Sequence, residues 1–178
     1  MRRMVIVAVG ALMVCANGDV TSAQQAPPAA CKSALRGALD FWVGDWVVTD
    51  TASHERAGTD RVERVSKGRA VIERWKGVSG DEGTSLFSFD PYACTWHQLW
   101  ITDRPERVGG LKHKDLVALL AGGGVRFQGA YPGRRTVTVL DRTTLRPLRD
   151  GTVRQLIEVS IDGGTTWRAG FDAIYTPR

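Results

Sequence analysis

Apolar and polar residues alternate in short segments along most of this chain. Arg61–Val65 alternates charged and apolar side chains, as a strand does when one of its faces is exposed. Turn-forming sequences such as Gly80–Gly83, Pro132-Gly133 and Asp162–Gly164 separate the segments. Short strands joined by tight turns indicate antiparallel β-structure, as a sandwich or as an up-and-down barrel. We interpret the chain as an all-β protein, a single antiparallel up-and-down β-barrel.

The first strand is expected at Phe41–Val48, with Trp46 plugging one end of the barrel. Before it, Ser33–Asp40 carries apolar residues at helical spacing behind a serine that can cap a helix. A short N-terminal helix is therefore expected, closing the barrel mouth. Val117–Leu120 shows no alternation, and periodicity cannot separate a buried strand from a helical turn there. The other strands are expected at Arg61–Val65, Arg69–Gly77, Thr84–Phe89, Trp96–Thr102, Val108–His113, Leu116–Ala121, Val125–Tyr131, Thr136–Thr143, Val153–Ile161 and Thr166–Tyr175.

Residues 1–23 have the layout of a secretory signal peptide. A basic start precedes a short apolar run at Val5–Ala16, and small residues lead up to Ala23. The run is too short to anchor the chain in a bilayer, so no stable membrane span is expected. Acylation at Cys15 is the alternative, but Val14 is bulkier than lipoprotein signals usually allow. We therefore expect an exported protein, periplasmic or secreted, after cleavage near Ala23.

Removal of the signal leaves Cys31 and Cys94 as the only cysteines. An even pair in an exported protein is most simply a disulfide, and closing so long a loop stabilises a fold by about 4 kcal/mol in the chain-entropy model. Residues 24–32 are expected to form a flexible leader. Since no break divides the rest, residues 33–178 are expected to form one domain.

The chain carries a net charge of +5, which indicates solubility and a weak attraction to anions. Its basic residues, such as Arg104, Lys112 and Arg134, are spread over several expected loops. Nucleic-acid binding normally requires a concentrated basic stripe with aromatic residues. We therefore expect no nucleic-acid partner.

Gly44-Asp45-Trp46 resembles the Gly-x-Trp signature of lipocalins, and a wider pattern is more specific. That pattern comprises Leu39–Trp46, Ile72–Gly77, Trp96-x-Gln98-x-Trp100, and Glu158–Trp167 with Phe171-Asp172 and Tyr175. Together these resemble a bacterial family of exported or cytosolic proteins of unknown function with a lipocalin-like (calycin) barrel. The resemblance covers nearly the whole mature chain. It implies a fold and a cavity, and no activity that could be transferred.

Ser160–Trp167 also matches the Asp-box, Ser-x-Asp-x-Gly-x-Thr-Trp. It resembles the boxes that recur in sialidases and other propeller proteins, where they are folding elements. Only one copy occurs here, and the chain is far too short for a propeller. Because Asp and Ser in turns usually bond to the backbone, we interpret the box as a hairpin stabiliser.

Strand alternation sorts the candidate site residues by face. The inward faces are expected to carry Val71, Glu73 and Trp75; Trp96, Gln98 and Trp100; Val153, Gln155, Ile157 and Val159; and Trp167, Ala169, Phe171, Ala173 and Tyr175. An aromatic cavity with a few polar groups is the usual makeup of a small-molecule pocket. The alternative is that the aromatic residues fill a solid core. The predicted ligand-binding residues are Trp46, Glu73, Trp75, Gln98, Trp100, Gln155, Phe171 and Tyr175.

Two carboxylates lie in the middle of expected strands, Glu73 and Glu158. A buried pair of this kind can do acid–base chemistry, although such residues are more often solvated or in ion pairs. None of the three histidines lies two residues from another, and no His-x-Glu group occurs. No metal site and no cofactor are therefore expected; haem at His97 or His113 is the alternative, and both lie near charged or turn residues. Nucleophile-elbow, phosphate-loop and dinucleotide motifs do not occur.

Our first hypothesis is that an exported barrel binds a small, largely apolar molecule in an aromatic-lined cavity. The second is a calycin-type isomerase or hydrolase that uses Glu73 as acid or base with Gln98 or Glu158, which requires a strongly shifted carboxyl group in the cavity. The third is an envelope interaction module with a filled core. The sequence leaves open which applies, and with it catalysis and the oligomeric state.

Overall fold

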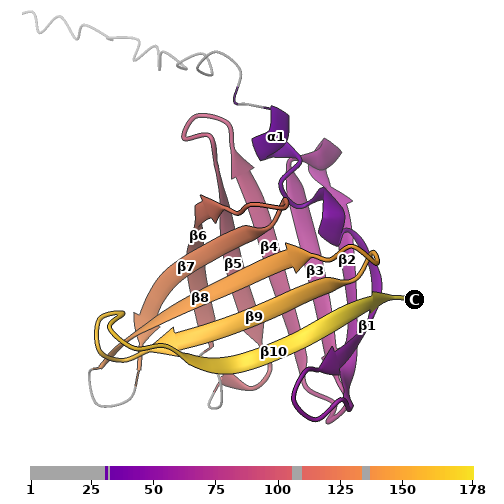
Figure 1. The fold of residues 1–178 in the computed structure, drawn as a ribbon. Coiled ribbons are helices and arrows are strands. Elements are labelled where there is room, and N and C mark those ends of the chain that lie inside the picture. The colour runs from indigo at the N-terminus through magenta and orange to yellow at the C-terminus, as the bar shows by residue number, and fades with distance from the viewer. Residues whose placement is uncertain (1–30, 32, 106–109, 134–136) are drawn as a thin grey trace, which may run out of the picture.

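The computed structural model describes residues 31, 33–105, 110–133 and 137–178. The expected signal peptide and nearly all of the expected leader lie outside these residues. In the described part of the chain, ten strands form a closed barrel in which each strand is antiparallel to its neighbours and β10 pairs with β1 (Figure 1). The predicted up-and-down barrel is confirmed. The strands are β1 (Gly44–Asp50), β2 (Arg56–Val65), β3 (Ala70–Gly77), β4 (Glu82–Asp90), β5 (Thr95–Thr102), β6 (Leu111–Leu119), β7 (Val125–Pro132), β8 (Thr138–Pro147), β9 (Val153–Ser160) and β10 (Arg168–Pro177).

Two short helical elements precede β1 at one end of the barrel, α1 (Ser33–Arg36) and the 3-10 helix η1 (Asp40–Trp42) (Figure 1). A further 3-10 turn, η2 (Ser66–Gly68), joins β2 to β3. The predicted N-terminal helix is confirmed. The predicted strand start at Phe41 is wrong, because the backbone turns through η1 and the strand begins at Gly44. No helix in the described residues is long and apolar enough to cross a membrane.

A packed aromatic core fills the end of the barrel beneath η1. Trp42 is fully buried and meets Phe87 edge-on, with 5.3 Å between ring centroids. Phe87 in turn packs against Phe127 at 5.2 Å. The indole N–H of Trp46 donates to the carbonyl of Trp42 at 3.0 Å. Because the rings interlock with little exposed area, this end of the barrel is closed.

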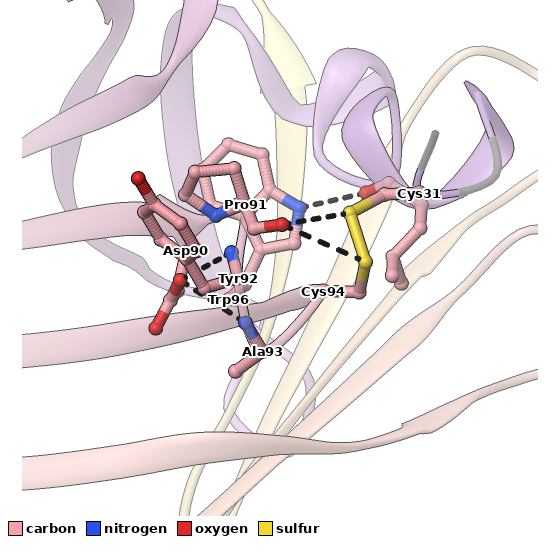
Figure 2. Close-up of a disulfide and its surroundings, with 8 residues drawn as sticks. Cys31, Asp90, Pro91, Tyr92, Ala93, Cys94 and Trp96 are labelled. Atoms are coloured by element: carbon pink, nitrogen blue, oxygen red, sulfur yellow. Dashed lines mark hydrogen bonds between the residues drawn. A yellow bond between two sulfur atoms is a disulfide. The ribbon is translucent and has the colours of Figure 1, made fainter. Parts of the chain in front are cut away.

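A disulfide between Cys31 and Cys94 fastens the N-terminal segment to the β4–β5 turn, as predicted (Figure 2). The carboxylate of Asp90 stabilises this turn by accepting two backbone N–H bonds. Close by, the indole N–H of Trp96 donates to the carbonyl of Leu35 in α1 at 2.7 Å. The covalent link and this hydrogen bond together hold α1 against the closed end.

β6 joins the two segments that the sequence leaves separate, Val108–His113 and Leu116–Ala121; the start of the first lies outside the described residues. The register with β7 shifts between Leu116 and Ala118. A bulge of this kind adds one unpaired residue to one strand of a pair. Burial nevertheless alternates through the whole of β6, with Val117 and Leu119 exposed. Val117–Leu120 shows no period of two because apolar residues occupy both faces of the strand there.

A second bulge changes which residues of β10 face inward. The register with β9 shifts between Ala169 and Phe171, so Phe171, Ala173 and Tyr175 face the interior while Ala169 is exposed. The prediction that Trp167 and Ala169 share a face with Phe171, Ala173 and Tyr175 is therefore wrong. Trp167 lies before β10 and packs beneath the guanidinium of Arg142, 4.0 Å from the ring centroid.

The Asp-box lies in the β9–β10 turn. The Asp162 carboxylate accepts hydrogen bonds from the backbone N–H of Thr166 at 3.0 Å and from its hydroxyl at 2.6 Å. The Ser160 hydroxyl accepts the N–H of Gly164 at 2.9 Å. These bonds, those of Thr166 above all, hold the pKa of Asp162 well below its usual range. The interpretation of the box as a hairpin stabiliser is confirmed by this set of local bonds.

Candidate functional site

The half of the barrel away from η1 contains a cavity of about 450 Å³. This volume lies within the range of small-molecule pockets. Ser79 in the β3–β4 turn lines the cavity and is exposed, and half-buried Arg104 lines it just after β5. The cavity therefore opens at the end of the barrel opposite α1, where the β3–β4 turn lies (Figure 1).

Seven of the eight predicted ligand-binding residues line this cavity, namely Glu73, Trp75, Gln98, Trp100, Gln155, Phe171 and Tyr175. Trp46 lies in the packed core, with its ring centroid 6.4 Å from that of Tyr175. It points inward as predicted, but it lies too near the closed end to reach the cavity.

Three aromatic side chains form one wall of the cavity. Trp75 and Phe171 meet edge-on, with centroids 5.8 Å apart, and Trp100 lines the cavity beside them. A Cβ atom added to Gly83 would lie 2.1 Å from the ring of Trp100. Since only a residue without a side chain leaves that space, Gly83 lets the indole lie against β4. At the open end, the indole N–H of Trp75 donates to Asp81 at 3.1 Å.

The wall next to Trp100 carries two buried lysines on β6 that share one carboxylate. The ammonium groups of Lys112 and Lys114 lie 2.6 Å and 2.5 Å from the two oxygens of Asp141, which is fully buried on β8. Lys114 also donates to the hydroxyl of Thr143 at 2.6 Å. Burial lowers the pKa of Lys114, and the negative charge of Asp141 opposes that shift. Two ammonium groups against one carboxylate leave an excess of positive charge at this wall.

Sequence reasoning missed these lysines, although Lys112 and Lys114 stand at alternate positions of one strand. The face of a strand is assigned from its apolar residues, and the single apolar residue of Leu111–Asp115 is Leu111, which is on the outward face. The barrel register supplies what was missing. Lys114 lies opposite Gln98 and Lys112 opposite Trp100, both of which were predicted to face inward.

A pair of buried carboxyl groups, Asp60 and Glu73, lies in the middle of the barrel. Burial, followed by the neighbouring charge of Glu73, raises the pKa of Asp60 well above its usual range. Burial also raises the pKa of Glu73. Two carboxyl groups in contact in a dry interior cannot easily both ionise, so the pair retains a proton to unusually high pH. Glu73 lines the cavity.

Several polar groups of this middle layer bond to one another. The Tyr175 hydroxyl donates to the Gln155 side-chain carbonyl, and the amide of Gln98 donates to the Ser85 hydroxyl at 3.1 Å. Burial raises the pKa of Tyr175 well above its usual range. Among the described residues, the Gln98 Oε1 and Glu73 Oε2 atoms find no hydrogen-bond partner. Both are buried atoms of side chains that line the cavity.

The remaining candidates face away from the cavity. Glu158 forms a bidentate ion pair with Arg142 at 2.7 and 2.8 Å on the outer wall, so it cannot act together with Glu73. His113 is exposed and His97 half-buried, both on the outward faces of their strands. Neither histidine reaches the cavity, so the haem alternative has no ligand there.

No protein-family model matches the chain, and no curated protein is similar enough to it to count as a match. The resemblance to lipocalin-like proteins thus remains a prediction from the sequence motifs.

Proposed function

We propose that this barrel binds a small amphipathic molecule in its interior cavity. The apolar body of the ligand lies against Trp75, Trp100 and Phe171, and its acidic group meets Lys112 and Lys114. One observation carries the proposal: two buried lysines that share a single carboxylate line the same cavity as Trp75, Trp100 and Phe171. The polar wall refines the expectation of a largely apolar ligand, since it adds an anionic head group to an apolar body.

The electrostatics of the cavity support an anion rather than a cation. A lysine ammonium has three donors, and an ion pair with one carboxylate leaves donors unused. The neighbouring pair of Asp60 and Glu73 offsets this charge only where it is ionised, and burial favours the protonated form of both carboxyl groups. An incoming carboxylate or sulfonate therefore finds charge-assisted hydrogen bonds in a dry site, where they are strong.

We also infer that the protein works outside the cytoplasm. Its disulfide supports this location, because such bonds persist in oxidising compartments and are rare in the cytosol.

Two fluorescent probes with the same apolar body test the proposal. The sulfonate 1-anilinonaphthalene-8-sulfonate carries an anionic group, and N-phenyl-1-naphthylamine lacks it. We expect the wild-type protein to bind the sulfonate more tightly. Lys112→Met should weaken sulfonate binding about tenfold, the worth of one charged hydrogen bond, and should leave the amine unaffected. Lys76→Met, on an exposed lysine of β3, is the matched control and should change neither.

Trp100→Ala should weaken the binding of both probes to the same extent, because it removes part of the aromatic wall without removing a charge. Equal affinity of the two probes, or equal losses in Lys112→Met and Lys76→Met, would refute the acidic head group. Native mass spectrometry of protein from its own source, compared with the denatured mass, then reports the size of a natural ligand.

Acid–base catalysis by Glu73 is a second candidate function, and one observation favours it. Glu73 lines the cavity and has a raised pKa, as a carboxyl group must to donate a proton near neutral pH. The carboxyl partner of Glu73 is Asp60, and not Glu158 as predicted from the sequence. Turnover of a bound natural ligand by the wild type and its loss in Glu73→Gln would establish this function. Unchanged recovery of the ligand after incubation with the wild type would exclude it.

A further inference from the structure

Three potential metal ligands meet on the outer wall of the barrel, outside the cavity. His97 on β5 lies directly opposite Asp115 on β6 in the sheet register. His113 lies two residues before Asp115 on the same strand, so its side chain is on the same outward face. Two neighbouring strands thus bring three side chains together, all of them within the described residues.

The geometry suits a single ion. The Nδ1 atom of His97 lies 2.6 Å from Oδ1 of Asp115, and the Nε2 atom of His113 lies 3.7 Å from the same oxygen. The donor atoms of all three side chains lie within 4.8 Å of one another. Ligands of a tetrahedral zinc ion, at about 2 Å from the metal, are separated by distances of this order. The two imidazole rings already stack, with centroids 5.8 Å apart.

The surroundings do not oppose a cation. The residues that face these ligands in register are Ser88 opposite His97, Leu99 opposite His113 and Gln128 opposite Asp115. None of the three carries positive charge. The ligands stand on regular paired strands, so the backbone has little freedom to lose when the side chains close on an ion.

We propose that His97, His113 and Asp115 bind one divalent transition-metal ion of the Zn²⁺ type. Two imidazoles and one carboxylate are a known ligand set for zinc, with the fourth position left to water or to another group. The ion ties β5 to β6 from outside, across the wall whose inner face carries Lys112 and Lys114. This site is independent of the proposed ligand cavity, because its residues point in the opposite direction.

The pairing of His113 with Asp115 is visible in the sequence as His-x-Asp, a spacing that places two ligands on one strand face. A search for paired histidines and for His-x-Glu passes over it. The third ligand, His97, is separated from the pair by the β5–β6 connection, and only the barrel register brings it opposite Asp115.

Zinc titration of the untagged mature protein, followed by calorimetry and native mass spectrometry, tests the proposal. We expect one zinc ion per chain in the wild type. His97→Ala and His113→Ala should each weaken binding about tenfold or more, since even the loss of a residue behind a ligand costs that much. His54→Ala removes the third histidine of the chain, in the exposed β1–β2 turn, and should bind zinc as the wild type does.

A second readout excludes a folding artefact. Zinc should raise the thermal midpoint of the wild type and of His54→Ala by mass action, and should leave the midpoints of His97→Ala and His113→Ala unchanged. Circular dichroism without metal should be the same for all four proteins. No zinc bound by the wild type would overturn the proposal and leave a hydrogen-bonded histidine–aspartate pair only. Zinc bound equally by all variants would also overturn it.

Discussion

The two halves of the barrel interior come from the same strands but differ in chemistry. Beneath η1, the interlocked rings of Trp42, Phe87 and Phe127 are fully buried. In the other half, Lys114 and its partner Asp141 are also buried, but Lys114 lines the cavity. Close packing stabilises a fold strongly, whereas the desolvation of buried ions largely offsets their attraction. We infer that stability is concentrated in the closed half, which leaves the other half free to keep a cavity.

The largest expected effect comes from emptying the closed half. Phe87→Ala should lower the free energy of unfolding by about 3–5 kcal/mol, because it leaves a cavity among rings that cannot collapse. Phe171→Ala is the matched change in the open half, where the ring already borders a cavity, and should cost less than half as much. Urea unfolding of both variants measures the difference. Equal losses would show that the two halves stabilise the fold alike.

The next effect concerns the buried charges. Asp141→Asn should destabilise the fold by about 3 kcal/mol, because Lys112 and Lys114 would remain buried beside each other without a counter-charge. Asp172→Asn breaks an outer ion pair with Arg154 at 2.6 Å and should cost about 1 kcal/mol or less. The same urea titration compares them. If Asp141→Asn loses no more stability than Asp172→Asn, the side chains of Lys112 and Lys114 reach solvent in the Asp141→Asn variant.

The pH dependence of stability tests whether the pKa of the buried Asp60 is raised in the folded protein. Unfolded Asp60 ionises near pH 4, while in the folded state its pKa is raised by burial and by Glu73. Above about pH 4 the folded state therefore binds more protons, and stability falls as pH rises, by at most about 1.4 kcal/mol per pH unit. Asp60→Asn removes this dependence.

Urea unfolding from acid to neutral pH should therefore show that Asp60→Asn gains stability relative to the wild type as pH rises. A constant difference between the two proteins across that range would mean that Asp60 ionises normally in the folded state.

The features of the fold that follow a local period could be predicted from sequence. Turn sequences and alternation gave the barrel, and the parity of Glu73, Gln98 and Gln155 placed these side chains in the cavity. Bulges defeat this reasoning, since one extra residue reverses every face beyond it. Gly170 is the unpaired residue of the β10 bulge, and a glycine within a strand is itself a sign of a bulge; strict alternation passes over it and assigns Trp167 to the inside.

The chemistry of the site depends on pairings between distant strands. Asp141 contacts Lys112 although 29 residues separate them, and Asp60 and Glu73 meet because β2 pairs with β3. An isolated lysine or aspartate in a strand carries no sign of its future partner. Sequence therefore indicated where a cavity would lie, and the register determined which charges face it.

The smallest expected effect contrasts the two mid-strand glutamates, Glu73 and Glu158. The guanidinium of Arg142 lowers the pKa of Glu158 on the outer wall, and burial raises that of Glu73 inside. Glu158→Gln should cost about 1 kcal/mol or less near neutral pH. That cost should shrink as pH falls below about 4, where the unfolded carboxylate is protonated first, and should vanish below the lowered pKa of the folded state.

The pH dependence has the opposite sign for Glu73→Gln. Because the pKa of Glu73 is raised in the folded state, the wild type should lose stability relative to this variant as pH rises. Probe binding adds a second contrast, since Glu158→Gln leaves the cavity untouched and should bind the naphthalene sulfonate as the wild type does. If the stability of both glutamate variants shifted with pH in the same direction, Glu73 would be ionised in the folded state. Its negative charge would then offset a lysine, and the cavity would have no excess positive charge.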